Sequence, residues 1–290
     1  MKKMILASIF IIVTVGVVFS LKEVRGKSFE KETSFAVDSV EEIEVNNENW
    51  NVEFKKAESK KVTIAAEGKQ KDKKKDPVTV KNDGKKIIVN QQDQKGRFID
   101  GFSFGKKGTI YISIPKNEVD TITLHNRSGD IKMNDVTTKN IVLSNVSGSE
   151  KIEGLSAEKG TFTSQAGELS VKDSSLKELS VSSTTGDNYI TNVTTPKMKV
   201  TSTDGEVSIK DIKEGKLLLV ETKLGDIGVS YKEAPTSLML TANSNSSDIT
   251  VNLNGLKKKT NTEKSKEGTI GDASNKVELL SKKGTININS

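Results

Sequence analysis

Apolar and polar residues alternate over short runs along most of this chain. The segments KMKVTST (Lys197–Thr203) and GEVSIKDI (Gly205–Ile212) show the pattern clearly, with apolar side chains two positions apart. A period of two places successive side chains on opposite faces of a β-strand, whereas a helix requires a period of about 3.6. The chain therefore predicts many short strands, separated by turns that contain Gly, Asp and Asn.

The alternation recurs with a period of 19 residues, marked by glycines at positions 129, 148, 167, 186 and 205, and the next glycine follows at position 225. Counted from each glycine, the fifth and fifteenth positions are apolar in every repeat. The fifth column contains Met133, Ile152, Val171, Ile190 and Ile209, and the fifteenth contains Leu143, Phe162, Val181, Val200 and Leu219. A frame kept over this many repeats indicates a repeating fold.

A repeat of this length with strand periodicity is typical of one coil of a β-solenoid. We therefore predict an all-β chain in which residues 125–290 form a parallel β-solenoid with coils of about 19 residues, whose apolar columns stack inside. Residues 28–124 lack the frame and predict a β-rich capping region. Its expected strands are Glu42–Asn46, Trp50–Phe54, Val62–Ala66, Val78–Val80, Lys86–Asn90 and Thr109–Ile114.

Two segments near the C-terminus depart from the frame. Gly255–Gly268 (GLKKKTNTEKSKEG) predicts an exposed hairpin or loop, and Lys283–Ser290 (KGTININS) predicts a last strand. Both follow the 20-residue step to Gly225, after which the repeat drifts.

Residues 1–27 predict a membrane anchor or a signal segment rather than part of the fold. Met4–Leu21 is an uncharged run of 18 residues with lysines on both sides. Its length is near the lower limit for a transmembrane helix, while Val18–Ser20 offers a cleavage site. We favour the retained N-terminal transmembrane helix, which predicts a single-pass protein of the cell membrane with its bulk extracytoplasmic.

The net charge of +6 does not indicate a nucleic-acid partner. Residues 1–27 account for +4 of it, and the chain has three arginines, Arg25, Arg97 and Arg127. Nucleic-acid binding needs a concentrated basic face with Arg or aromatic contacts. The basic run Lys69–Asp76 predicts a solvated hairpin loop, or a surface for anionic envelope polymers or lipid head groups. The sequence contains no cysteine, which excludes disulfides and thiolate metal sites.

Two short segments are candidate interaction surfaces. One is the lysine cluster of that basic run. The other lies in the glycine-rich segment Gly96–Gly108 and forms either a loop folded over the cap or an exposed apolar tip. The candidate residues are Lys73, Lys74, Lys75, Phe98, Phe102 and Phe104.

We expect no catalytic, cofactor-binding or metal-binding residues. His125 is the single histidine and follows a predicted strand beside a turn. The position after each repeat glycine holds Asp130, Ser149, Glu168, Asp187, Glu206 and Asp226. These acids favour turn residues that bond backbone N–H groups. The alternative is a secreted carbohydrate-active β-solenoid enzyme that uses this surface ladder. Stacked carboxylates also suit Ca²⁺, but the dense G-G-x-G-x-D calcium signature is missing.

The segment Gly108–Val136 (GTIYISIPKNEVDTITLHNRSGDIKMNDV) resembles the bacterial putative-adhesin family of β-strand-repeat proteins, and in particular its LiaG-like members. A strand that ends in Pro115, then an alternating strand, then the S-G-D-I turn at Ser128–Ile131 carry the resemblance, which covers roughly residues 37–290. It implies a cell-envelope setting and a link to envelope stress. The expected function is binding, adhesion or scaffolding, with a cell-envelope component or envelope protein as the partner.

Overall fold

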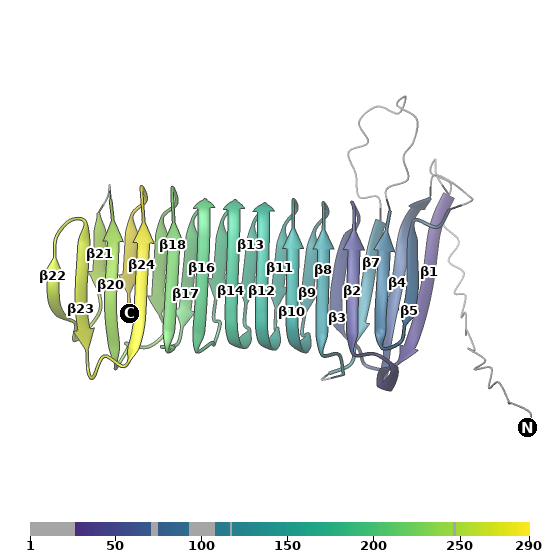
Figure 1. The fold of residues 1–290 in the computed structure, drawn as a ribbon, viewed down its shortest axis with the longest axis horizontal. Coiled ribbons are helices and arrows are strands. Elements are labelled where there is room, and N and C mark those ends of the chain that lie inside the picture. The colour runs from purple at the N-terminus through teal and green to yellow at the C-terminus, as the bar shows by residue number, and fades with distance from the viewer. Residues whose placement is uncertain (1–26, 71–74, 93–107, 117, 246–247) are drawn as a thin grey trace, which may run out of the picture.

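The computed structural model describes residues 27–70, 75–92, 108–116, 118–245 and 248–290. They form one elongated stack of coils, with strands of successive coils side by side along the long axis (Figure 1). Two sheets of 12 and 13 strands, named here sheet A and sheet B, face each other across the stack. The expectation of an all-β chain with parallel, solenoid-like coils is confirmed for these residues.

Each typical coil contributes one strand to each sheet. A short 3-10 helix, η1 (Val37–Ser39), is the one helix among the described residues. In spatial order, sheet A contains β1 (Lys27–Ala36), β4 (Lys61–Gln70), β7 (Gly108–Ile114), β3 (Asn51–Lys56), β9 (Ile131–Asn134), β11 (Glu150–Glu153), β13 (Leu169–Lys172), β15 (Asn188–Thr191), β17 (Val207–Ile212), β19 (Ile227–Tyr231), β25 (Ile286–Asn289) and β21 (Ile249–Asn252). Sheet B contains β22 (Lys257–Asn261), β23 (Ser265–Ile270), β20 (Leu238–Ser244), β24 (Asn275–Ser281), β18 (Leu217–Thr222), β16 (Lys197–Asp204), β14 (Ser175–Thr185), β12 (Ser156–Ala166), β10 (Thr137–Asn145), β8 (Thr121–Asn126), β2 (Glu42–Asn47), β6 (Lys86–Gln91) and β5 (Val78–Asp83).

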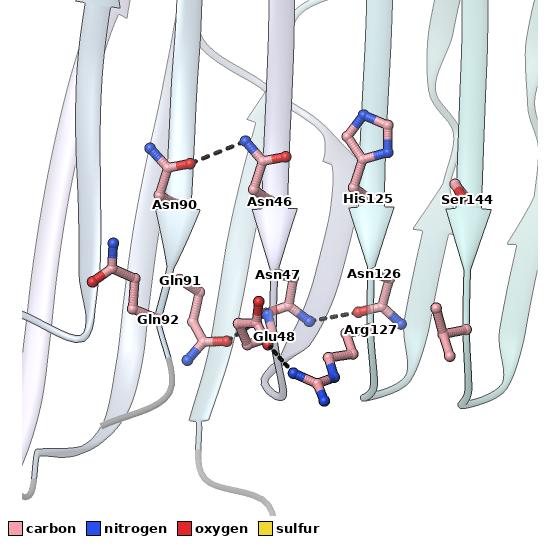
Figure 2. Close-up of a pocket in the computed structure, with 11 residues that line it drawn as sticks. Asn46, Asn47, Glu48, Asn90, Gln91, Gln92, His125, Asn126, Arg127 and Ser144 are labelled. Carbon is pink, nitrogen blue, oxygen red and sulfur yellow. Dashed lines mark hydrogen bonds and ion pairs between the residues drawn. The ribbon is translucent and has the colours of Figure 1, made fainter. Parts of the chain in front are cut away.

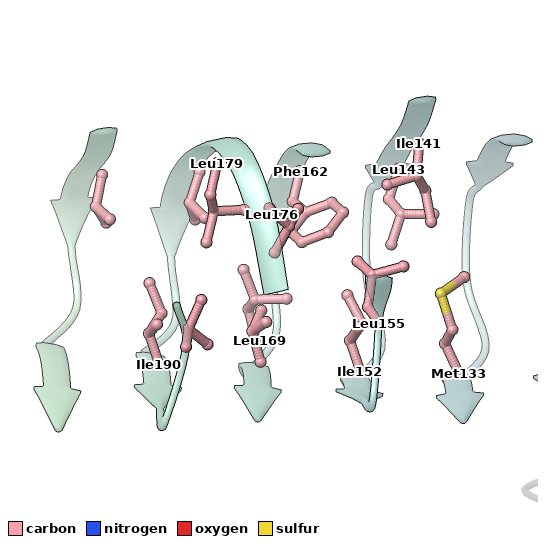
Figure 3. Close-up of a cluster of buried hydrophobic side chains, with 14 of the residues drawn as sticks. Met133, Ile141, Leu143, Ile152, Leu155, Phe162, Leu169, Leu176, Leu179 and Ile190 are labelled. Carbon is pink, nitrogen blue, oxygen red and sulfur yellow. The ribbon is translucent and has the colours of Figure 1, made fainter. Parts of the chain in front are cut away.

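The strand register reproduces the 19-residue period. Phe162 pairs with Leu143 on one side and with Val181 on the other, and all three side chains are buried. The fifth column stacks in the same way in sheet A, where Ile152 lies between Met133 and Val171. Figure 3 shows side chains from both columns meeting between the sheets. The two apolar columns are therefore the two halves of one thin core.

One assignment from the sequence is wrong. Leu219 was expected to continue the fifteenth column, but Val200 pairs with Val220 instead. The step from Gly205 to Gly225 is 20 residues, so the extra residue moves the buried position by one. Because side chains alternate across a strand, a shift by one turns Leu219 outward, where it is half-buried.

The turns repeat a left-handed backbone at two places in the coil. Gly186 has φ of 108°, and a Cβ there would overlap the carbonyl oxygen of Gly167 in the preceding coil. The seventh column has φ between 48° and 69°, which Gly, Asn and Asp tolerate better than other residues. It contains Asp135, Gly154, Asp173, Asn192 and Asp211. Turn chemistry thus fixes both corners of each coil.

Antiparallel strands cover both ends of the stack. At one end β1 pairs with β4, β4 pairs with β7, and β5 pairs with β6. At the other end β22 and β23 form a hairpin against β20. The hairpin predicted at Gly255–Gly268 is therefore confirmed, and its lysines discourage the pairing of another chain with this edge. The six strands predicted for residues 28–124 are present as β2 to β7, and β1 was not predicted.

The described part of residues 28–124 does more than cover an end. Strand β2 pairs in parallel with β8, and β3 pairs in parallel with β9. Both sheets therefore run without a break across position 124. The stack begins upstream of the first regular repeat, although the sequence there lacks the 19-residue frame.

Chain order and spatial order diverge near the C-terminus. The strand predicted at Lys283–Ser290 exists as β25, but it lies between β19 and β21, and β24 lies between β18 and β20. Figure 1 shows β24 in this inner position. The coil formed by β24 and β25 is therefore enclosed by two others that precede it in the chain.

The expected transmembrane segment Met4–Leu21 lies outside the described residues. Among the residues that the structure does describe, no helix is long and apolar enough to span a membrane.

Candidate functional site

A polar groove lies where four neighbouring strands of sheet B end. Strands β6, β2, β8 and β10 contribute side chains to a cavity of about 710 Å³ (Figure 2). Amide side chains dominate its lining, together with one imidazole, one hydroxyl and one ion pair. Its volume lies within the range usual for small-molecule sites. We refer to it below as the amide groove.

The floor of the groove belongs to a buried polar column that follows the corner of every coil. Its side chains reach over the turn to a carbonyl three residues ahead, as Asn126 Nδ2 does to Gly129 O at 2.8 Å and Thr222 Oγ1 does to Gly225 O at 2.7 Å. The members of this corner column are Asn47, Asn126, Asn145, Ser164, Ser183, Ser202, Thr222, Ser281 and Ser244. The column closes each turn from inside.

Hydrogen bonds hold the floor amides in place. Asn47 Nδ2 donates to Asn126 Oδ1 at 2.5 Å, and Asn126 Nδ2 donates to Asn145 Oδ1 at 2.7 Å. Gln91 Oε1 accepts from the backbone N–H groups of Glu48 and Asn49 at 2.9 and 2.8 Å. The floor is therefore rigid before any ligand arrives.

The rim carries side chains at one register position of adjacent strands. Asn90, Asn46, His125 and Ser144 lie next to one another in the ladder, on β6, β2, β8 and β10. Asn46 Nδ2 donates to Asn90 Oδ1 at 3.0 Å and to Glu44 Oε1 at 2.8 Å. His125 is exposed, so its imidazole faces solvent at the rim.

Charges around the groove are balanced in pairs. Arg127 Nη1 lies 3.1 Å from Glu48 Oε2, and Lys86 Nζ lies 2.6 Å from Glu44 Oε2. The Lys86 ammonium, helped by Asn46, holds the pKa of Glu44 below its usual value. The two carboxylates in turn raise the pKa of Lys86 to about 12. All four groups therefore stay ionised at neutral pH, and their charges cancel.

A second polar feature is fully buried. Glu150 occupies the third column between Ile131 and Leu169 and has no exposed surface. Its Oε1 accepts from Asn145 Nδ2 at 2.8 Å, whereas Oε2 has no hydrogen-bond partner among the described residues. Burial raises the pKa of this carboxyl, and Asn145 and Ser164 oppose the rise. A buried acid of this kind destabilises the fold when it is ionised.

The acids that follow the repeat glycines act as turn residues. Asp130 Oδ1 accepts from the N–H of Ser149 at 3.2 Å, and Asp187 Oδ1 accepts from the N–H of Glu206 at 2.8 Å. The prediction that they bond backbone N–H groups is confirmed for these residues, with one difference. The N–H belongs to the next coil, so these acids link coils rather than close their own turn.

The surfaces selected from the sequence fall mostly beyond the part that can be described. Phe98, Phe102, Phe104, Lys73 and Lys74 lie outside the described residues. Lys75 is exposed shortly before β5, and the adjacent Asp76 pairs with Lys31 at 2.9 Å. Within the described ranges, no group of three or more His, Asp or Glu side chains is arranged to hold a metal ion.

The sequence interpretation missed the amide groove, and only part of it could have been found. The corner column keeps the 19-residue spacing through Asn126, Asn145, Ser164, Ser183 and Ser202, so a search for recurring polar positions would have shown it. The rim joins Asn46 to Asn90 and His125, which are 44 and 79 positions away. No periodicity connects these residues, and only the pairing of the strands brings them together.

Comparisons with known proteins agree with this architecture. A family model described as Toastrack DUF4097 matches residues 40–289. No curated protein matches the chain.

Solved structures share the fold at low sequence identity. A putative adhesin from Bacteroides fragilis NCTC 9343 is 15% identical, with 91% of this chain and 96% of that chain covered and a TM-score of 0.56. Two proteins from Parabacteroides distasonis ATCC 8503 are also 15% identical. The one described as a putative adhesin has a TM-score of 0.46 over 91% of this chain and 98% of its own. The one described as a putative lipid binding protein has a TM-score of 0.44 over 92% and 98%. At such identities the likeness to the first structure shows the fold alone.

Proposed function

The chain belongs to the Toastrack DUF4097 family, and from that premise we propose that it is a membrane-anchored, extracytoplasmic β-repeat protein that binds a component of the cell envelope. Adhesion or scaffolding is the role, and a LiaG-like link to envelope stress is part of the proposal. The partner is an envelope polymer or an envelope protein. The helix formed by residues 4–21 provides the anchor.

The observation that carries the proposal is the exterior of the stack. Apolar side chains fill the interior, while outward positions of sheet B carry a regular row of hydrogen-bonding side chains that ends in the amide groove. Such a rigid, elongated surface suits the holding of an extended partner. The description of the Bacteroides fragilis structure as a putative adhesin supports this reading.

The acidic ladder does not favour catalysis. Asp130, Asp187 and Asp226 each accept a hydrogen bond from a backbone N–H of the neighbouring coil. Carboxylates with a structural role in every coil need no catalytic explanation. The three neighbouring structures are described by adhesion or lipid binding and not by a reaction.

Topology tests the proposal directly. Protease added to intact cells or protoplasts should digest the β domain and leave a short N-terminal membrane fragment. A cytoplasmic marker protein must survive the same treatment. Cross-linking in cell envelopes, followed by pull-down with glycan and protein readouts, should then recover a reproducible partner. A domain that protease cannot reach would refute the compartment and with it the envelope role.

A further inference from the structure

The rim of the amide groove presents fixed hydrogen-bonding atoms to solvent. Asn46 spends its Nδ2 group on Asn90 and Glu44, which orients both amides. Among the described residues, Asn46 Oδ1 and Asn90 Nδ2 have no hydrogen-bond partner, so one acceptor and one donor remain available. His125 and Ser144 continue the row at a strand spacing of about 4.8 Å. A ligand therefore meets alternative donors and acceptors in a line.

Strand addition is not open to a ligand at this place. Strands β6, β2, β8 and β10 are all interior strands of sheet B, and each pairs with a neighbour on both sides. Their backbone N–H and C=O groups are occupied by this pairing. An extended peptide would therefore find no free sheet edge here. Recognition must come from the side chains of the rim.

The charge balance selects a neutral ligand. Arg127 is paired with Glu48, and Lys86 is paired with both Glu42 and Glu44. A site for a polyanion would need cations in excess, and a site for a polycation would need anions in excess. The groove offers neither. It offers planar amides, a hydroxyl and an imidazole, and Val146 adds an exposed apolar contact at the edge.

We infer that the amide groove binds a neutral oligosaccharide. Ring hydroxyls would exchange hydrogen bonds with Asn46, Asn90, His125 and Ser144, while Val146 would contact an apolar face of the sugar. This inference rests on the proposed function, because it takes the envelope component to be a glycan. The row of hydroxyl side chains continues at Thr163, Ser182 and Thr201 in the same register, so a longer glycan can extend across the strands.

Weak binding at a single site follows from the chemistry of the lining. No aromatic ring lines the groove within the described residues, so hydrogen bonds exposed to water carry the interaction. Such bonds have modest net value, and we expect a dissociation constant on the order of 1 mM for a tetrasaccharide. The assay must therefore detect weak complexes.

The experiment uses the full-length chain in mild detergent and ligand-observed NMR. Probes are β-1,4-linked N-acetylglucosamine tetrasaccharide and cellotetraose, which separate acetamido glycans from plain ones, and a glycerol phosphate oligomer as the anionic control. We expect one or both neutral probes to bind and the anion not to bind. The double variant Asn90→Ala/His125→Ala should lose at least about tenfold in affinity. The matched variant Ser182→Ala/Thr201→Ala, in the same row outside the cavity, should stay within about twofold of the parent.

Three results would overturn the inference. They are no binding of either neutral probe at about ten times the expected dissociation constant, equal losses in both double variants, and tighter binding of the anionic oligomer. Far-UV circular dichroism of each variant verifies that the fold is kept. Protease accessibility and envelope cross-linking are measured separately. Exposed protein that captures an envelope partner but fails to bind these glycans would refute the groove assignment and leave the proposed function standing.

Discussion

Replacing Glu150 by Gln should stabilise the protein at neutral pH. The carboxyl of Glu150 is buried in an otherwise mostly apolar column, and only one of its oxygens has a hydrogen-bond partner among the described residues. Gln keeps the shape and the acceptor for Asn145 Nδ2. It also brings an amide N–H beside Ser164 Oγ, which is buried and without a partner in the described structure. The substitution therefore satisfies two groups and removes a charge.

The size of the effect follows from the cost of the unsatisfied atoms. A buried polar group without a partner costs about 1–3 kcal/mol, and more when it is charged. We expect Glu150→Gln to raise the free energy of unfolding by about 1–3 kcal/mol at pH 8. For a domain of this size, each kcal/mol corresponds to about 2–4 °C in the melting temperature.

The effect should depend on pH with a definite sign. The folded state raises the pKa of Glu150, mainly through burial, so the folded state binds this proton more tightly than the unfolded state. Parent and variant should be almost equally stable below about pH 4, where the carboxyl is protonated in both states. As the pH rises, the parent should lose stability until the carboxyl is ionised in the folded state as well. The difference then stays constant.

Urea and thermal unfolding followed by far-UV circular dichroism between pH 4 and pH 8 measure this difference. Glu168→Gln is the matched control, because Glu168 is an exposed carboxylate in the adjoining coil and should leave the melting temperature unchanged within about 1 °C. A stability difference between Glu150→Gln and the parent that is the same at every pH would refute the reasoning. So would a variant that is less stable at pH 8.

Two further predictions test the register and the acidic ladder. Val181→Asp should unfold or aggregate the protein, because it places a charge between Phe162 and Val200 at a likely cost of at least about 3 kcal/mol, whereas Ser182→Asp should melt like the parent; equal melting of both would refute the register. Replacing Glu168, Asp187 and Glu206 together by Asn should shift stability only modestly and leave envelope binding intact, because Asn keeps an oxygen that can accept from the neighbouring coil. Loss of a glycan-cleaving activity in this triple variant, measured by product release, would restore the enzyme alternative.

The sequence was sufficient for the regular part of the fold. Apolar columns such as Met133 to Ile209 recur at a fixed spacing, because each coil must place an identical side chain above the previous one. A period of this kind fixes strand type, register and core together. Its weakness is an insertion, since one extra residue before Gly225 was enough to exchange Leu219 for Val220 at the buried position.

The remaining features depend on contacts between distant parts of the chain. The rim of the amide groove requires β2 to lie between β6 and β8, and no local pattern in Asn46, Asn90 or His125 specifies that order. The buried position of Glu150 was visible as the third column, yet its unsatisfied oxygen depends on the side chains of Asn145 and Ser164. Pairing order and the completeness of hydrogen bonding are properties of the assembled coils.

The inner position of the coil formed by β24 and β25 sets the order in which the protein can assemble. Strands from β8 to β19 can add to the stack one coil at a time as the chain emerges, since each docks on its predecessor. Strands β20 to β23 cannot do so, because the coil on which they dock has not yet been made. They must wait, with their apolar faces uncovered, until residues 275–289 arrive. A chain cut before residue 275 would therefore lack an inner coil and leave β20–β23 undocked, which makes it a ready substrate for quality-control proteases.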